Sequence, residues 1–246
     1  IYHEIFEKLA TKSFVALFLA AMCGAIGSGV AATLSYYVYT FIFEFSSQQI
    51  GYISISVVLS AIIAFVAAPL IGKTLGKKRG AIVVGLFAFT IVPAPVILWL
   101  LGLMPENGDP LLLPLLLMNA AGFSFSIGMG MVAIMSMIGD IVDENELLCG
   151  ERQEGLFFSA RAFFAKASNS VGHFFAGIML EYYVRLPLQA IPGELSADTL
   201  TRLGVSAGPI MGVAAIFSLL IYSRYNLSRD RHQEIMGKLR ERAATG

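Results

Sequence analysis

Long apolar runs separated by short polar segments dominate the chain. A helix needs about 20 mostly apolar residues to cross a bilayer, and continuous runs of that length predict helices rather than strands. The pattern therefore predicts an all-helical integral membrane protein, with a linker at 1–13, a bundle over 14–223 and a basic tail at 224–246. The six transmembrane helices are expected over residues 14–43, 50–72, 81–104, 111–138, 156–183 and 205–223.

Small residues, prolines and turn residues modify this pattern. GAIGSG at 24–29 favours close packing of a neighbouring helix; the alternative is a flexible point in a moving helix. Pro93 and Pro95 predict a kink in the third run. PENGDP at 105–110 predicts a turn, and the proline-rich, charged segment 185–202 predicts a loop.

The distribution of Lys and Arg predicts the orientation. An even number of spans places both ends on one side of the membrane, and cytoplasmic loops carry the excess of Lys and Arg. The loops on the opposite side hold Arg185 and Arg202. The segments on the side of the termini hold Lys8, Lys12, Lys73, Lys77, Lys78, Arg79, Arg152, Arg224, Arg229, Arg231, Lys238, Arg240 and Arg242. Both termini are therefore expected in the cytoplasm, in a multi-pass protein of the inner or plasma membrane.

Composition excludes several classes of protein. Hydrophobic residues make up 57% of the chain and charged residues 14%, whereas a soluble chain is about 25% charged. A net charge of zero argues against a nucleic-acid partner. Cys23 and Cys149 match no disulfide or metal-ligand spacing, so neither a metal site nor another cofactor is expected. There is no Gly-rich phosphate loop or Ser–His–Asp arrangement that would indicate an enzyme.

An acidic segment between the fourth and fifth runs is the most unusual part of the sequence. A loop is expected from residue 139 to 155, carrying Asp140, Asp143, Glu144, Glu146, Glu151, Arg152 and Glu154. Its spacing does not fit a calcium-binding EF-hand loop. We expect instead a solvated charge network that opens and closes the cytoplasmic face.

Two cations follow inside the fifth run. Each costs about 2.5–3.5 kcal/mol on insertion scales. At 1.5 Å per residue, Lys166 lies roughly 16 Å into the bilayer, with Ser170 and His173 on nearly the same helical face. Arg161 points about 140° away from that face, so the two cations are expected in different surroundings.

Each of these residues has a structural and a functional interpretation. Lys166 is either salt-bridged to a neighbouring helix or faces an aqueous pathway. The second is favoured because the chain offers no acidic residue at that depth; the partner carboxylate is then expected on polypeptide outside this chain. Arg161 either pairs with the acidic loop or lines the pathway. For His173, a hydrogen-bonded interior histidine is favoured over a pathway residue.

The segment from Asp140 onward resembles one in a known transporter family. The segment reads DIVDENELLCGERQEGLFFSARAFFAKASNSVG. It is similar to the link between the tenth and eleventh helices of the glycoside–pentoside–hexuronide:cation symporters, the melibiose-carrier-like branch of the major facilitator superfamily. The shared pattern consists of Asp140, Asp143, Glu146, Arg152, Glu154 and Lys166.

The resemblance implies the C-terminal six-helix bundle of a major-facilitator fold. It implies a cation-coupled symporter for a sugar or glycoside-like solute, working by alternating access. The coupling cation, Na⁺ or H⁺, would bind mainly on the N-terminal six-helix half, which would be the partner of this bundle alongside the solute and the lipid bilayer. Lys166 would approach the cation site across the interface between the halves. Asp140, Asp143, Glu146, Arg152 and Glu154 would form the cytoplasmic gate.

Two positions depart from the family pattern. Met131 occupies a place where sugar-carrying relatives tend to have an aromatic residue, and Arg161 replaces a neutral or aromatic one. A cation at 161 would suit an anionic solute. The alternatives to a sugar symporter are a lysolipid-type carrier of the same family and a six-span membrane scaffold without transport activity.

Overall fold

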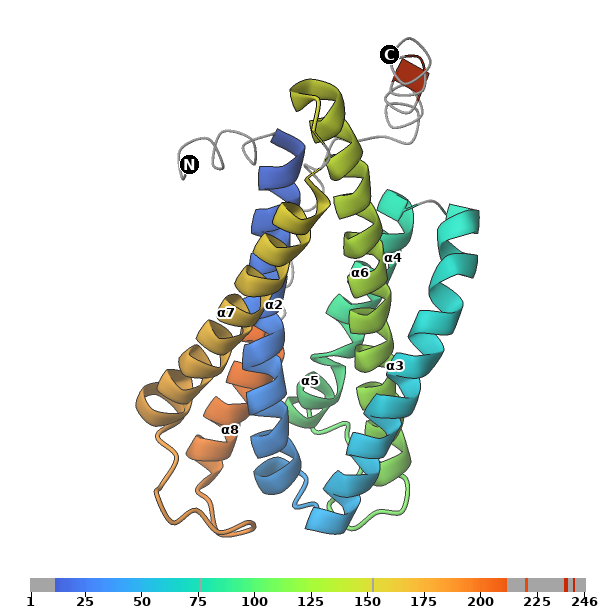
Figure 1. Cartoon of the computed structure of the whole chain (residues 1–246). Helices are drawn as coiled ribbons and strands as arrows, with labels where there is room; N and C mark the ends of the chain where they lie inside the picture. The colour runs from blue at the N-terminus through green and yellow to red at the C-terminus, as the bar shows by residue number, and fades with distance from the viewer. Residues whose placement is uncertain are drawn as a thin grey trace.

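The computed structural model describes residues 12–75, 77–151, 153–211, 220, 237–238 and 241 of the chain. In that part the chain consists of helices joined by turns and loops and contains no strand, which confirms the all-helical prediction (Figure 1). The elements, in chain order, are α2 (Lys12–Tyr37), η1 (Val38–Ile42), α3 (Ser47–Leu75), α4 (Lys77–Ile91), α5 (Ala94–Leu100), α6 (Leu112–Cys149), α7 (Glu154–Ile178), η2 (Met179–Val184), α8 (Ala197–Val205) and η3 (Ser206–Ile210).

The long helices form two groups. α2 packs along α7, and α6 packs against both α3 and α4. Figure 1 shows the start of α2, the α3–α4 junction and the α6–α7 junction at the same end of the bundle. That end is the one that the Lys and Arg distribution predicts to be cytoplasmic.

Three of the described helices are long and apolar enough to cross a membrane. They are the segments Phe18–Ile42, Ser47–Gly72 and Leu112–Leu147. These correspond to the first, second and fourth predicted spans. The total of six spans stays a prediction.

The third predicted span is divided into two helices. α4 ends at Ile91 and α5 begins at Ala94, with a turn at residues 92–93 between them. Proline at 93 and 95 lacks the backbone N–H that would continue the ladder, and its ring clashes with the preceding turn. The predicted kink is therefore a complete break.

The loop predicted from residue 139 is wrong for most of its length. α6 continues without interruption to Cys149 and ends at Gly150, which has a left-handed backbone (φ 79°) and donates its N–H to Glu146 O. Ile138, Ile141, Val142 and Asn145 are buried along this extension. Their i, i+3, i+4, i+7 spacing is that of a helix face, so packing carries the helix beyond its uniformly apolar part.

The loop predicted at 185–202 is also shorter than expected. α8 begins at Ala197, and the Ser196 side chain caps it by accepting the Thr199 N–H at 3.2 Å. Asp198 and Arg202 add an ion pair of 2.9 Å one turn apart. Of the linker predicted at 1–13, Lys12 and Ser13 belong to α2, and the rest lies outside the described residues. Most of the sixth predicted span beyond Met211 and the short helix expected within the tail also lie largely outside them.

Buried apolar residues gather in three clusters. The largest contains Val30, Leu34, Leu112, Leu116 and Leu203. A second cluster, at the end where α6 meets α7, consists of Ala20, Met137, Ile138, Ile141, Val142 and Phe157. A third, between α3, α4 and α6, consists of Ala64, Ala68, Val84 and Met129.

α3 leaves a broad apolar surface uncovered. More than half of each of these side chains is exposed: Ile55, Val58, Leu59, Ile62, Ile63, Phe65, Val66 and Leu70. A contiguous apolar surface of this kind indicates contact with lipid or with another polypeptide.

Candidate functional site

α7 carries four of the five candidate pathway residues, and its course is determined by close packing on α2. At the contact between the two helices, glycine faces glycine. A Cβ atom at Gly172 would lie 3.0 Å from Gly29 Cα and would overlap the carbonyl group of Ile26. A Cβ atom at Gly29 would likewise overlap the carbonyl oxygen of Asn169. The small residues at 24–29 therefore serve helix packing, the favoured interpretation of that motif.

A line of polar side chains joins α2 and α7 beside this contact. His173 Nδ1 lies 2.7 Å from Thr33 Oγ1, and His173 Nε2 lies 3.1 Å from Asn169 Oδ1. Asn169 Nδ2 donates to Ser28 Oγ at 3.1 Å and to the Ala25 carbonyl at 3.3 Å. We call these residues, Ser28, Thr33, Asn169 and His173, the α2–α7 polar seam. The expected hydrogen bonding of His173 is present, although its side chain is exposed in this chain.

Asn169 and Thr33 were not predicted as functional candidates from the sequence. A usable signal was present, because Asn169 lies four residues before His173 and three after Lys166, hence on the same side of the helix. Polar side chains in membrane-length helices usually bond across helices.

The seam predicts a difference between two neighbouring substitutions. Asn169→Ala removes the bonds to Ser28, Ala25 and His173, and should lower the free energy of unfolding by about 1 kcal/mol, the scale of hydrogen bonds between membrane helices. Ser170→Ala is the matched control, because the Ser170 hydroxyl bonds its own helix at Lys166 O (3.0 Å) and its loss should have little effect. Thermal melting of both variants checks this; equal stability would contradict an inter-helix role for Asn169.

Lys166 lies on an exposed part of α7. It is twelve residues after the start of the helix at Glu154, about 18 Å along its axis. No ion pair of Lys166 is formed within the described residues, and Phe163, one turn away, is 66% exposed. An ammonium group beside uncovered apolar surface at this depth requires either a partner or water.

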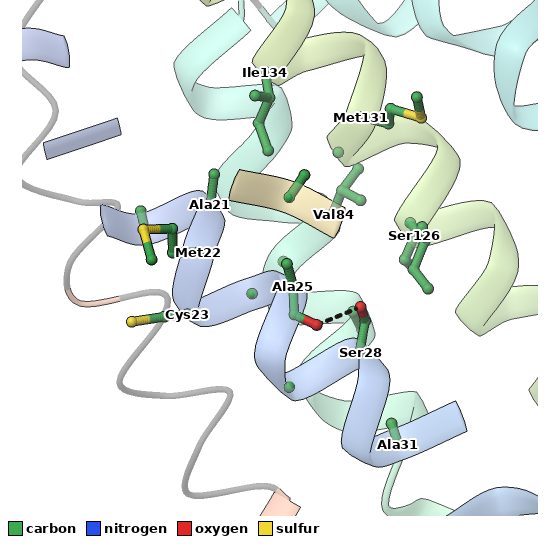
Figure 2. A pocket seen from close by; sticks show the side chains of 18 of the residues that line it. Ala21, Met22, Cys23, Ala25, Ser28, Ala31, Val84, Ser126, Met131 and Ile134 are labelled. Atoms are coloured by element: carbon green, nitrogen blue, oxygen red, sulfur yellow. Dashed lines mark hydrogen bonds between the residues drawn. The ribbon is translucent and has the colours of Figure 1, made fainter. Parts of the chain in front are cut away.

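Arg161 lies on a different face and lines a cavity of about 400 Å³. The cavity lies between α2, α4, α6 and α7, and Met131 of α6 lines it as well. Figure 2 shows the α2 wall with Cys23 and Ser28, Val84 from α4, and Ser126, Met131 and Ile134 from α6. Lys166, Ser170 and His173 are absent from the described lining, in agreement with the 140° between Arg161 and Lys166.

The guanidinium of Arg161 is incompletely satisfied. Its Nε is buried and has no hydrogen-bond partner among the described residues. The ion pair with the acidic segment, one of the two interpretations of this residue, is absent from the described part of the chain. The candidate pathway residues thus divide into a cavity pair, Arg161 and Met131, and an α7 surface group containing Lys166, Ser170 and His173.

The candidate gate residues lie on helices rather than on a loop. Asp140 is buried (9% exposed), and Asp143 and Glu146 follow on the last turns of α6. Glu154 stands in the first turn of α7, where an acidic side chain interacts favourably with the helix dipole. Arg152 lies outside the described residues. Whether these residues act as a gate stays a prediction.

Long apolar helices, an uncovered apolar face and cations within a helix of membrane length together define a membrane-spanning helical protein. Residues 2–229 match the family model described as MFS/sugar transport protein, and the chain belongs to this family. The resemblance to major-facilitator sugar symporters is thereby confirmed.

One similar protein is an uncharacterized symporter of Synechocystis sp., which is 24% identical over 240 residues. The match covers 96% of this chain and 42% of that symporter. The chain therefore spans less than half the length of the curated relative that it matches.

Proposed function

We propose that this chain forms the C-terminal six-helix half of a cation-coupled symporter for a sugar or glycoside-like solute. The family supports a carrier rather than an enzyme, and the relative is called a symporter. The coupling cation is Na⁺ or H⁺, and its main site lies on the N-terminal half. The two halves rock about a midplane site to give alternating access.

The observation that carries this proposal is the position of Lys166. Its ammonium group lies on an exposed face of α7, outside the cavity within the bundle. Burying such a charge against the other half is favourable only if that half offers a carboxylate. Such a carboxylate would bind either the Lys166 ammonium or a coupling cation. The carrier would then have a different binding free energy with and without the cation, which coupling requires.

The acidic residues at the α6–α7 junction support a gate on the predicted cytoplasmic side. Asp140, Asp143 and Glu146 occupy the end of α6, and Glu154 opens α7. These residues would form ion pairs in one orientation of the two halves and lose them in the other. The ion pairs would therefore stabilise one orientation relative to the other. Both termini are then cytoplasmic, in a multi-pass protein of the cell membrane surrounded by lipid.

The test is solute accumulation by the intact protein in proteoliposomes. With an inward Na⁺ or H⁺ gradient, a coupled carrier raises the internal concentration of a radiolabelled sugar or glycoside above the external one. Without a gradient, the concentrations only become equal. Accumulation that is independent of both gradients would contradict coupling. If the protein gives no sugar flux at all, the lysolipid or scaffold alternatives are favoured.

A further inference from the structure

The cavity between α2, α4, α6 and α7 has a chemistry unlike that expected for a sugar. Its volume, about 400 Å³, lies within the range of roughly 300–1,000 Å³ usual for small-molecule sites. Apolar side chains such as Phe18, Ile127, Ile134 and Phe164 make up most of its described lining. The polar side chains among the described lining residues are Cys23, Ser28, Ser126 and Arg161.

The two serine hydroxyls are already engaged with the backbone. Ser28 Oγ donates to the Ala25 carbonyl at 3.0 Å, as drawn in Figure 2. Ser126 Oγ donates to the Gly122 carbonyl at 2.8 Å. A sugar carries a hydroxyl on almost every carbon, and each buried hydroxyl without a partner is unfavourable. The described walls therefore offer too few free polar groups to hold a sugar inside the cavity.

Arg161 is the exception in this lining. It brings a permanent positive charge and five N–H donors, of which the buried Nε–H has no partner in the part of the chain that the structure describes. Native proteins rarely leave such a group unsatisfied. An anionic oxygen bound there would satisfy the donors and neutralise the charge, and a planar carboxylate, sulfonate or phosphate matches the guanidinium geometry.

We propose that this cavity is a binding site for an amphipathic anion, with the acidic group on Arg161 and an apolar body between α2, α4 and α6. Two sources share this chemistry: a solute carried across the membrane and a fatty acid or anionic lipid taken from the bilayer. The site is separate from the Lys166 surface, and its occupation does not depend on cation coupling.

Four soluble probes distinguish the contribution of negative charge to binding from that of apolar surface. Naphthalene-2-sulfonate is an apolar anion, naphthalene-2-sulfonamide its neutral counterpart, glucuronate a polar anion and methyl glucoside a polar neutral molecule. Binding to the intact protein in nanodiscs is measured by calorimetry, and binding to empty nanodiscs is subtracted. We expect naphthalene-2-sulfonate to bind at least about 10-fold more tightly than the other three, since both features are required. Equal or tighter binding of glucuronate, or no binding of naphthalene-2-sulfonate, overturns the proposal.

Two variants test the location of the site. Arg161→Gln should weaken the binding of naphthalene-2-sulfonate at least about 10-fold, the scale of a charged hydrogen bond. The affinity for the sulfonamide should not change. Gly130→Leu should abolish binding of the anion, because Gly130 lines the cavity and a Cβ atom there meets no atom of the described residues within 4 Å. Gly139→Leu is the matched control on α6: it has the same free space but lies outside the described lining.

The outcomes distinguish this proposal from that of coupled transport. If Arg161→Gln fails to fold, the Gly130→Leu and Gly139→Leu pair decides alone; equal binding by both variants overturns the site. Lys166→Ala should bind the anion as the unmodified protein does, whatever happens to uptake. Accumulation of radiolabelled naphthalene-2-sulfonate in proteoliposomes identifies a transported solute, whereas binding without accumulation identifies a ligand drawn from the membrane.

Discussion

Lys166→Ala in the intact transporter should abolish net solute accumulation while leaving solute exchange largely intact. In the proposed mechanism, the Lys166 ammonium and the coupling cation neutralise the same carboxylate in turn. When the cation leaves, the variant has no charge to replace it. A bare charge at membrane depth costs about 2.5–3.5 kcal/mol on insertion scales, which would disfavour return of the empty carrier by more than 10-fold.

Two assays distinguish this effect from simple damage. Exchange, with saturating cation and solute on both sides, never requires the empty carrier to return and should persist. Gradient-driven uptake requires that step and should fall at least 10-fold. Lys166→Arg retains the charge and should recover part of the uptake, and Lys238→Ala, at an exposed residue of the tail, should behave as the unmodified protein. Undiminished gradient-driven uptake by Lys166→Ala would contradict the coupling role.

The helices could be predicted from apolar runs, but several of their ends could not. α3 and α6 follow runs long enough to leave little choice of structure. The end of α6 does not follow from hydropathy, because the charges at 140, 143, 144 and 146 interrupt the apolar run before the helix ends. The buried stripe of Ile138, Ile141, Val142 and Asn145 was present in the sequence and shows that a helix can leave the apolar layer without ending.

The separation of Arg161 from Lys166 could be predicted, whereas the cavity could not. Two residues five positions apart on a helix point in directions that follow from its geometry alone. A cavity depends on how α2, α4, α6 and α7 pack, and Ser28, Val84 and Met131 come together from distant parts of the chain. The bond from Asn169 to Ser28 spans 141 residues, and a single sequence does not reveal such a pairing.

The close contact of α2 and α7 gives the largest expected effect on stability. Gly172→Ala adds one methyl group, which would overlap the Ile26 carbonyl and press on Gly29 Cα. Backbone atoms cannot rotate away as a side chain can, so the helices must separate. Overpacking of a well-packed site costs about 1–3 kcal/mol, occasionally more. We expect a loss near the upper end, about 3 kcal/mol, because the movement would also stretch the bonds of the α2–α7 polar seam.

Gly177→Ala is the matched control on the same helix, because a Cβ atom at Gly177 meets no atom within 4 Å in the described part of the chain. It replaces glycine with a better helix former and should leave stability unchanged or slightly raised. The two variants of the intact protein are compared by thermal melting in detergent and by the fraction recovered as a monodisperse species. Because α7 carries both Lys166 and Arg161, a shift of this helix should also weaken naphthalene-2-sulfonate binding in Gly172→Ala but not in Gly177→Ala. Equal melting temperatures for the two variants would show that α2 and α7 do not approach as closely as the glycine contact requires.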